Sequence, residues 1–160
     1  MEDVLEVYSR PYDERCPVVC MDKKPLQLLG EACKGKRVSN GAYIQDSEYV
    51  RNGTCSIFLL TEPLAGYRHV KALEHRTKID WAHQMKWLVD NVYPKAEKII
   101  LVCDNLNMHN KSAFYEAFQP AEALRLSKKI EFHYTPKHGS WLDIAEIEFS
   151  SLSKQCLGKR

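Results

Sequence analysis

The sequence lacks an apolar run of about 18 residues, the length that a membrane-spanning helix needs. It also lacks a signal peptide, an internal repeat and a low-complexity segment. We therefore expect a cytoplasmic protein with reduced cysteines and no membrane partner. The 160 residues suffice for one domain with a substantial core.

Neither the charge nor the cysteine pattern points to a particular partner. The formal net charge is only +2, so charge alone does not indicate a nucleic-acid-binding protein. The six cysteines are scattered, and only Cys16 and Cys20 are close together. No second pair or nearby histidine completes a zinc-binding pattern.

The order of the apolar segments predicts one domain over residues 17–160, preceded by a polar linker or lead-in over 1–16. Apolar runs predict strands at 17–22, 54–61, 67–74, 98–104 and 129–135, with a loop over 30–48. Helical spacing predicts helices from Thr77 to before Pro94, over 112–118 and 121–126, and over about 141–156. This order predicts an α/β fold with a mixed five-stranded sheet, antiparallel in its first half, parallel in its second, and flanked by helices.

Two of the predicted strands end in aspartates, Asp22 and Asp104. Sites in open α/β sheets form outside the carboxyl ends of parallel strands, so neighbouring strands would place these two carboxylates side by side. Close carboxylates repel each other unless they share a proton or a cation. Hard oxygen ligands favour magnesium or manganese.

A third carboxylate would complete a two-metal site for phosphoryl transfer. The last predicted helix offers Asp143, Glu146 and Glu148, and the two glutamates flank its apolar stripe on opposite sides. Helix geometry therefore leaves both residues open as the third ligand. The predicted stripe consists of Leu142, Ala145, Phe149, Leu152 and Cys156.

Five segments resemble the catalytic domain of DDE transposases, in the bacterial insertion-sequence branch of the mariner-type superfamily. They are PVVCMDKKPLQLLGE (17–31), YVRNGTCSIFLLTEPLAGYRHV (49–70), EHRTKIDWA (74–82), LVCDNLNMH (101–109) and HYTPKHGSWLDIAEIEFSSLSKQCL (133–157). The resemblance implies an RNase H-like fold and two Mg²⁺ or Mn²⁺ ions. It also implies cleavage and transfer of DNA strands at transposon ends. By position, it makes Asp22, Asp104 and Glu146 the catalytic residues and metal ligands.

The resemblance also implies partners and a location. DNA would be the substrate, and a second copy of the chain or a full-length transposase would be a possible partner. The protein would act in the bacterial cytoplasm, on the nucleoid. Family members generally carry helix-turn-helix domains before this region and an extension after it, and we expect this chain to lack both. Two positions depart from the family pattern: Lys23 stands where an acid is usual, and Asp143 where asparagine is common.

Other residues near the predicted site have a functional and a structural interpretation. Lys137 and His138, in the loop before the last helix, either contact a DNA phosphate or are simply solvated. Trp141 is the tryptophan that we expect to stack on a base. The supporting candidates are Asn105, His109 and Asp143.

Two further functions stay open at this stage. The chain could be a truncated, non-catalytic transposase remnant that binds DNA or a full-length transposase. It could also be a host nuclease of the same fold, which would share the chemistry but not the specific motifs.

Overall fold

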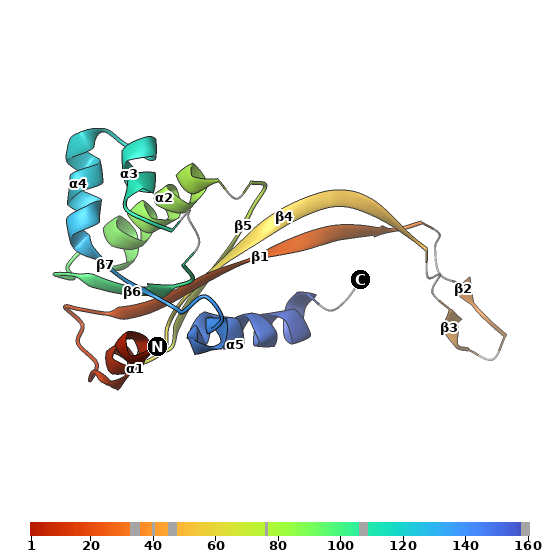
Figure 1. Ribbon diagram of the computed structural model, residues 1–160. Coiled ribbons are helices and arrows are strands. Elements are labelled where there is room, and N and C mark those ends of the chain that lie inside the picture. Colours follow the sequence, from red (N-terminus) through yellow and green to blue (C-terminus); the bar gives the residue numbers. More distant parts are fainter. Residues whose placement is uncertain (33–35, 40, 45–47, 76, 106–108, 158–160) are drawn as a thin grey trace.

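The centre of the molecule is a five-stranded mixed sheet. The computed structural model describes residues 1–32, 36–39, 41–44, 48–75, 77–105 and 109–157. The strands of the sheet are β1 (Val18–Glu31), β4 (Tyr49–Glu62), β5 (Tyr67–Leu73), β6 (Ile99–Cys103) and β7 (Ile130–Tyr134). Their order is β5-β4-β1-β6-β7 (Figure 1). β1, β4 and β5 pair antiparallel, whereas β6 pairs parallel with β1 and β7, so the predicted mixed sheet is confirmed.

Helices cover both faces of this sheet (Figure 1). One face carries α2 (Lys78–Trp87), α3 (Ser112–Ala117) and α4 (Pro120–Lys129). The other face carries α1 (Glu2–Ser9) and α5 (Ile144–Leu152). None of the helices within the described ranges is long and apolar enough to cross a membrane.

The alternation of side chains along the central strands builds two hydrophobic cores. On β1, Val19 and Met21 pack in the core beneath α2, α3 and α4, whereas Cys20 packs in the core beneath α1 and α5. On β6, Cys103 joins the first core and Val102 the second. Successive side chains of a strand point to opposite faces, so the even-numbered residues of both strands face α1 and α5.

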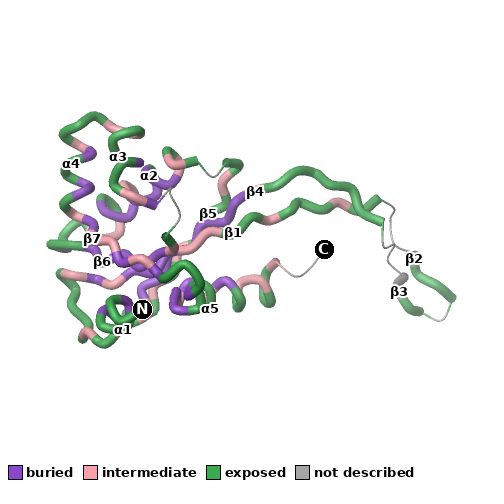
Figure 2. Tube along the Cα trace, viewed as in Figure 1, coloured by how far each residue is buried: buried purple, intermediate pink, exposed green. Residues whose placement is uncertain are grey.

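β1 and β4 are much longer than the strands predicted at 17–22 and 54–61. β6 accompanies β1 only as far as Met21, and β5 accompanies β4 only from Ser56 onward. Beyond these points β1 and β4 form a two-stranded ribbon, most of which is exposed (Figure 2). The sequence did not predict this part of β1 as a strand, because Pro25 and several polar residues interrupt the apolar run. Proline is tolerated there because, among the described strands, none pairs with the other edge of β1 at this point.

The ribbon leads to a small second sheet in the segment predicted as a loop over 30–48. It consists of β2 (Lys36–Arg37) and β3 (Tyr43–Ile44), which pair antiparallel. Two-residue strands are too short to produce a periodic signal in the sequence.

The predicted start of α2 is confirmed. The Thr77 hydroxyl accepts a hydrogen bond from the backbone N–H of Asp80, and the Asp80 carboxylate accepts one from that of Thr77. Trp81 of this helix is fully buried. The helical region predicted over 112–118 and 121–126 forms two helices, because Pro120 begins α4, a position where its missing N–H costs nothing.

Residues 1–16, expected to be a linker or lead-in, contain a packed helix. Val4 and Val7 of α1 are fully buried against the sheet and α5. Their three-residue spacing and the acids Glu2 and Asp3 in the first turn are helical signals, but they are too few to stand out in a polar segment.

This packing predicts that α1 stabilises the domain. Val7→Ala should lower the free energy of unfolding by about 1.5–3 kcal/mol, because it removes buried methyl groups and leaves a cavity. Leu5→Ala, on the exposed side of the same helix, should change it by less than about 0.5 kcal/mol. Urea denaturation of both variants measures the difference. Equal effects would show that α1 is not packed on the sheet in solution.

Candidate active site

Two aspartates follow the last residues of the parallel pairing between β1 and β6. That pairing ends with Met21 opposite Cys103, so Asp22 and Asp104 come next on neighbouring strands. Both continue the even-numbered row that faces α5. One detail of the prediction is wrong: Asp22 does not end its strand, because β1 continues alongside β4.

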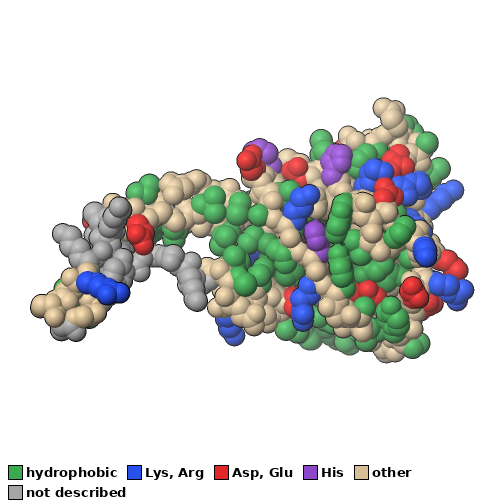
Figure 3. All heavy atoms as spheres, turned by 180° about the vertical axis from the view of Figure 1, so that it is seen from behind, with side chains coloured by type: hydrophobic (Ala, Val, Ile, Leu, Met, Phe, Trp, Pro, Cys, Tyr) green, Lys and Arg blue, Asp and Glu red, His purple; other side chains and the backbone are tan. Residues whose placement is uncertain are grey.

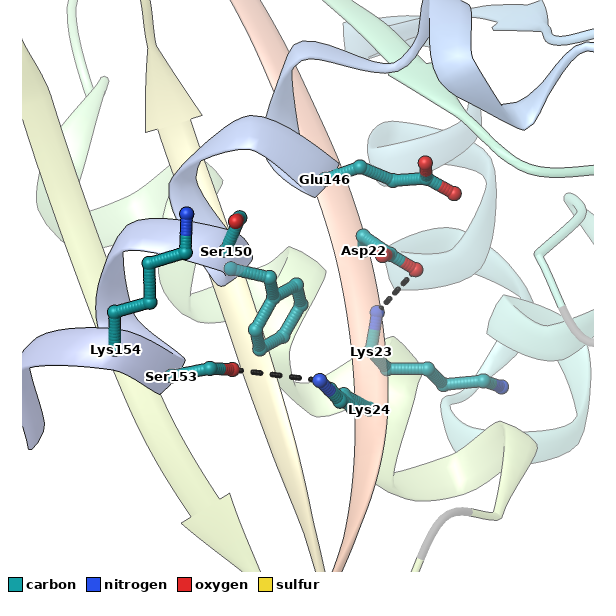
Figure 4. Close-up of a pocket in the computed structure, with 8 residues that line it drawn as sticks. Asp22, Lys23, Lys24, Glu146, Ser150, Ser153 and Lys154 are labelled. Atoms are coloured by element: carbon teal, nitrogen blue, oxygen red, sulfur yellow. Dashed lines mark hydrogen bonds between the residues drawn. The ribbon is translucent and has the colours of Figure 1, made fainter. Parts of the chain in front are cut away.

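Asp22 lies in a partly buried, negatively charged environment. Its Oδ1 accepts a hydrogen bond of 2.7 Å from the backbone N–H of Lys23, whose side chain extends away from Asp22 and Glu146 (Figure 4). Burial raises the pKa of Asp22, and the charges of Asp104 and Glu146 raise it further. The three carboxylates are therefore close enough to repel one another.

Asp104 is positioned by His109. The His109 side chain is fully buried, and its Nδ1 is hydrogen-bonded to Oδ1 of Asp104. The imidazole stacks on Trp81 at a centroid distance of 5.6 Å, and the His109 carbonyl accepts a 2.7 Å hydrogen bond from the Tyr134 hydroxyl. The contact with the buried His109 ring therefore fixes the orientation of the Asp104 carboxylate.

Helix α5 begins at Ile144, after a 3-10 turn at Ser140–Leu142, and not at the predicted Trp141. Asp143 caps it: Oδ1 accepts a 3.0 Å hydrogen bond from the backbone N–H of Ala145. Oδ2 of Asp143 is buried and has no hydrogen-bond partner among the described residues.

Burial and the neighbouring carboxylates act together on Asp143. Burial raises the pKa of Asp143 to about 8, and the charges of Asp22, Asp104 and Glu146 add to this effect. The site thus contains a fourth carboxyl group, which is largely protonated at neutral pH.

The N-terminal helix holds the start of α5 in place. The Tyr8 hydroxyl donates a 2.9 Å hydrogen bond to the carbonyl of Leu142 and lies 3.5 Å from the backbone nitrogen of Ile144. The same hydroxyl lies 3.4 Å from Sγ of Cys20 on β1. Tyr8 therefore joins α1, the central strand and the first turn of α5. The sequence contained no signal for this contact, because the partners are more than 130 residues apart.

The structure distinguishes the two glutamates between which helix geometry could not choose. Glu146 lies beside Asp22 and points into the same cavity (Figure 4). Glu148 lies on another side of α5 and forms an ion pair with Arg68 of β5. The geometry thus favours Glu146 as the third carboxylate.

The predicted apolar stripe of this helix is confirmed for Leu142, Ala145 and Phe149, which are buried. It is wrong at Cys156, which is exposed beyond the end of α5.

The residues predicted to contact DNA lie on the surface around the start of α5. Lys137 and His138 are exposed in the loop after β7, and Trp141 is 67% exposed. Asn105 is exposed directly after Asp104. Because these four side chains are exposed, they are accessible to a ligand.

The carboxylates suit a hard divalent cation by their chemistry. Four acidic side chains share one face of the sheet, and a buried Asp143 oxygen lacks a hydrogen-bond donor within the described part of the chain. In the same part of the chain, no three His, Cys, Asp or Glu side chains already form a cage around one point. A cation would therefore have to draw the carboxylates closer together. Its binding is favoured because it relieves their mutual repulsion.

A cavity of about 410 Å³ opens between β1 and α5, beside these carboxylates. Asp22 and Glu146 line one part of it (Figure 4). The sequence analysis missed the residues that line the rest. Strand and helix periodicity, counted from the two acids, would have found Lys24, Ser150, Ser153 and Lys154.

The raised pKa of Asp143 predicts how pH affects metal-free protein. Because the folded state holds this proton up to about pH 8, whereas the unfolded state releases it near pH 4, stability falls as pH rises between these values. Asp143→Asn keeps the helix cap and removes this loss. In EDTA, the free energy of unfolding of the variant minus that of the parent should be a few kcal/mol larger at pH 8 than at pH 5. Thermal unfolding at both pH values measures this, and a pH-independent difference would contradict it.

Comparison with known proteins identifies the family. A model of the family described as DDE superfamily endonuclease matches residues 17–160. Among solved structures, the chain is similar to the Mos1 mariner paired end complex with Mn, with a TM-score of 0.50 and 17% sequence identity. The likeness covers 94% of this chain and 46% of that one, and it confirms the predicted RNase H-like fold. No curated protein matches the chain. Because the family model covers most of the sequence, the chain belongs to the DDE superfamily endonucleases.

Proposed function

We propose that this chain is a transposase catalytic domain that cleaves and transfers DNA strands with the help of two Mg²⁺ or Mn²⁺ ions. The observation that carries the proposal is the convergence of Asp22, Asp104 and Glu146 from three different elements on one side of the sheet. Carboxylates that repel one another in the free protein are poised to bind cations. The quoted sequence motifs favour the bacterial insertion-sequence branch of the mariner-type superfamily.

In this proposal, each acidic residue has a distinct task. Asp22 and Asp104 would hold the ions from the strand side, and Glu146 from the helix side. His109 would keep Asp104 in the orientation that binding requires. Two divalent ions, when bound, activate the attacking oxygen and stabilise the leaving oxygen of an in-line displacement.

The reaction would proceed in two steps at phosphorus. A water oxygen attacks a phosphodiester, a P–O bond of the DNA breaks, and the leaving oxygen takes a proton as the 3′-hydroxyl of the cut strand. That 3′-hydroxyl then attacks a phosphodiester of the target, forming a new P–O bond and releasing a target 3′-hydroxyl. Neither step needs an oxidant or another reactant.

The charge of the chain bears on how it would bind DNA. The chain spans 46% of the solved mariner chain that it resembles. Basic and acidic side chains are interspersed on the face seen in Figure 3. With a net charge of +2, binding of DNA by this chain alone should be weak, non-specific and sensitive to salt.

A non-catalytic remnant is the second candidate function. It is favoured by Lys23, which stands where the family usually has an acid, and by the absence of a preformed metal cage among the described residues. Such a remnant would bind DNA or a full-length transposase without cutting.

Thermal unfolding separates the two candidates. Mn²⁺ at about 100 times its Kd should raise the Tm of the parent by about 5–10 °C relative to EDTA, because it binds only the folded site. Asp104→Asn removes one ligand and one negative charge, so its Tm in Mn²⁺ should rise much less. A parent protein that stays folded but shows no Mn²⁺ effect would favour the remnant.

Nicking of supercoiled plasmid in Mn²⁺ tests the catalytic assignment. Glu146→Gln and Asp104→Asn should lower the nicking rate more than about 100-fold, since each removes a charged ligand. Glu148→Gln is the matched control on the same helix, and it should nick within about threefold of the parent because Glu148 pairs with Arg68 away from Asp22. Loss of activity in Glu148→Gln, with Glu146→Gln still active, would exchange the roles of the two glutamates.

A further inference from the structure

The cavity between β1 and α5 changes its electrostatic character along its length. Asp22 and Glu146 line one part, and Lys24 and Lys154 line another (Figure 4). Lys23 also lines the cavity, with its side chain extending away from the two acids (Figure 4). Lys24 is two residues beyond Asp22 and therefore lies on the same face of β1, about 6.6 Å further along the strand. Lys154 is eight residues beyond Glu146, about 12 Å further along the helix axis.

The two lysines have no acidic partner in the described residues. The Lys24 ammonium lies 3.3 Å from the Ser153 hydroxyl, and no described carboxylate lies within 4.0 Å of Lys24 or Lys154. Lys86 and Lys98 differ in this respect, because both are paired with carboxylates. The cationic part of the cavity can therefore accept an anion from outside the chain.

Small side chains keep this part of the cavity open. Ser150 and Ser153 follow Glu146 at four and seven residues, so all three lie on one face of the helical segment. The serine hydroxyls can donate hydrogen bonds to an anion without filling the cavity.

We propose that Lys24, Ser153 and Lys154 form a subsite for a DNA backbone phosphate next to the one that is cut. The identity of the anion rests on the proposed function. A phosphodiester held at the carboxylates through cations has its next phosphate one nucleotide along the strand, a separation similar to that between Asp22 and Lys24. The strand would therefore run in the groove between β1 and α5, away from Asp104 and along the ribbon of β1 and β4.

Salt-dependent DNA binding tests this subsite. The affinity for a fluorescein-labelled oligonucleotide duplex is measured by anisotropy at several salt concentrations in EDTA. Lys24→Ala and Lys154→Ala should each weaken binding and reduce the slope of log K against log salt by about one. Lys95→Ala is the matched control, because Lys95 is exposed before the start of β6, at the opposite end of this strand from Asp104. It should keep the slope of the parent.

A second variant tests the shape of the subsite without changing its charge. Ser150→Trp should fill the cavity and weaken DNA binding at every salt concentration. The proposal would be overturned if Lys24→Ala and Lys154→Ala bound DNA with the affinity and salt slope of the parent. It would also be overturned if Lys95→Ala changed the affinity and salt slope by the same amount as they do. Normal binding by Ser150→Trp would overturn it as well.

The metal-dependent measurements separate this inference from the proposed function. The Tm increase in Mn²⁺ should persist in Lys24→Ala and Lys154→Ala, because neither side chain is a metal ligand. If the parent fails to nick DNA but the lysine variants still change the salt slope, the subsite stands and the catalytic proposal falls. If the parent nicks DNA and the lysine variants bind and nick as it does, the subsite falls and the catalytic proposal stands.

Discussion

The parallel pairing of β1 with β6 ends at Met21 and Cys103, and the next residue of each strand is an aspartate. The register of this pairing decides the environment of both carboxylates, because a shift by one residue would turn one of them to the opposite face of the sheet. In the observed register both face α5, where burial and mutual repulsion raise the pKa of Asp22. Residues that pack around this pair hold like charges together in the absence of a cation.

Helix α5 contributes to this arrangement through the way it is anchored. Leu142, Ala145 and Phe149 bury one side of this region against the sheet, and Tyr8 ties its first turn to the central strand. This anchoring turns Glu146 toward Asp22 and leaves Glu148 to pair with Arg68. The N-terminal helix, which lies outside the segment matched by the family model, thereby supports the geometry of the carboxylates.

Charge is divided along the groove between β1 and α5 in a way that suits a polyanionic strand. Carboxylates alone would repel DNA, whereas lysines alone would bind it without positioning cations for chemistry. Placed two residues apart on one strand, Asp22 and Lys24 combine both properties on a single face. Lys23 also lines this cavity, but its side chain extends away from Asp22 and Glu146 (Figure 4).

Local patterns in the sequence determined the mixed sheet, the capping box at Thr77 and the two aspartates, because strand alternation and helix capping act over a few residues. They did not reveal α1 or the long ribbon, whose polar residues obscure the periodicity. The family resemblance predicted Glu146 as the third carboxylate, but only the tertiary structure showed which glutamate faces Asp22 and joined Tyr8 to the start of α5. Both glutamates flank the same apolar stripe, so the packing of α5 against the sheet and its contact with Tyr8 determine which of them faces Asp22.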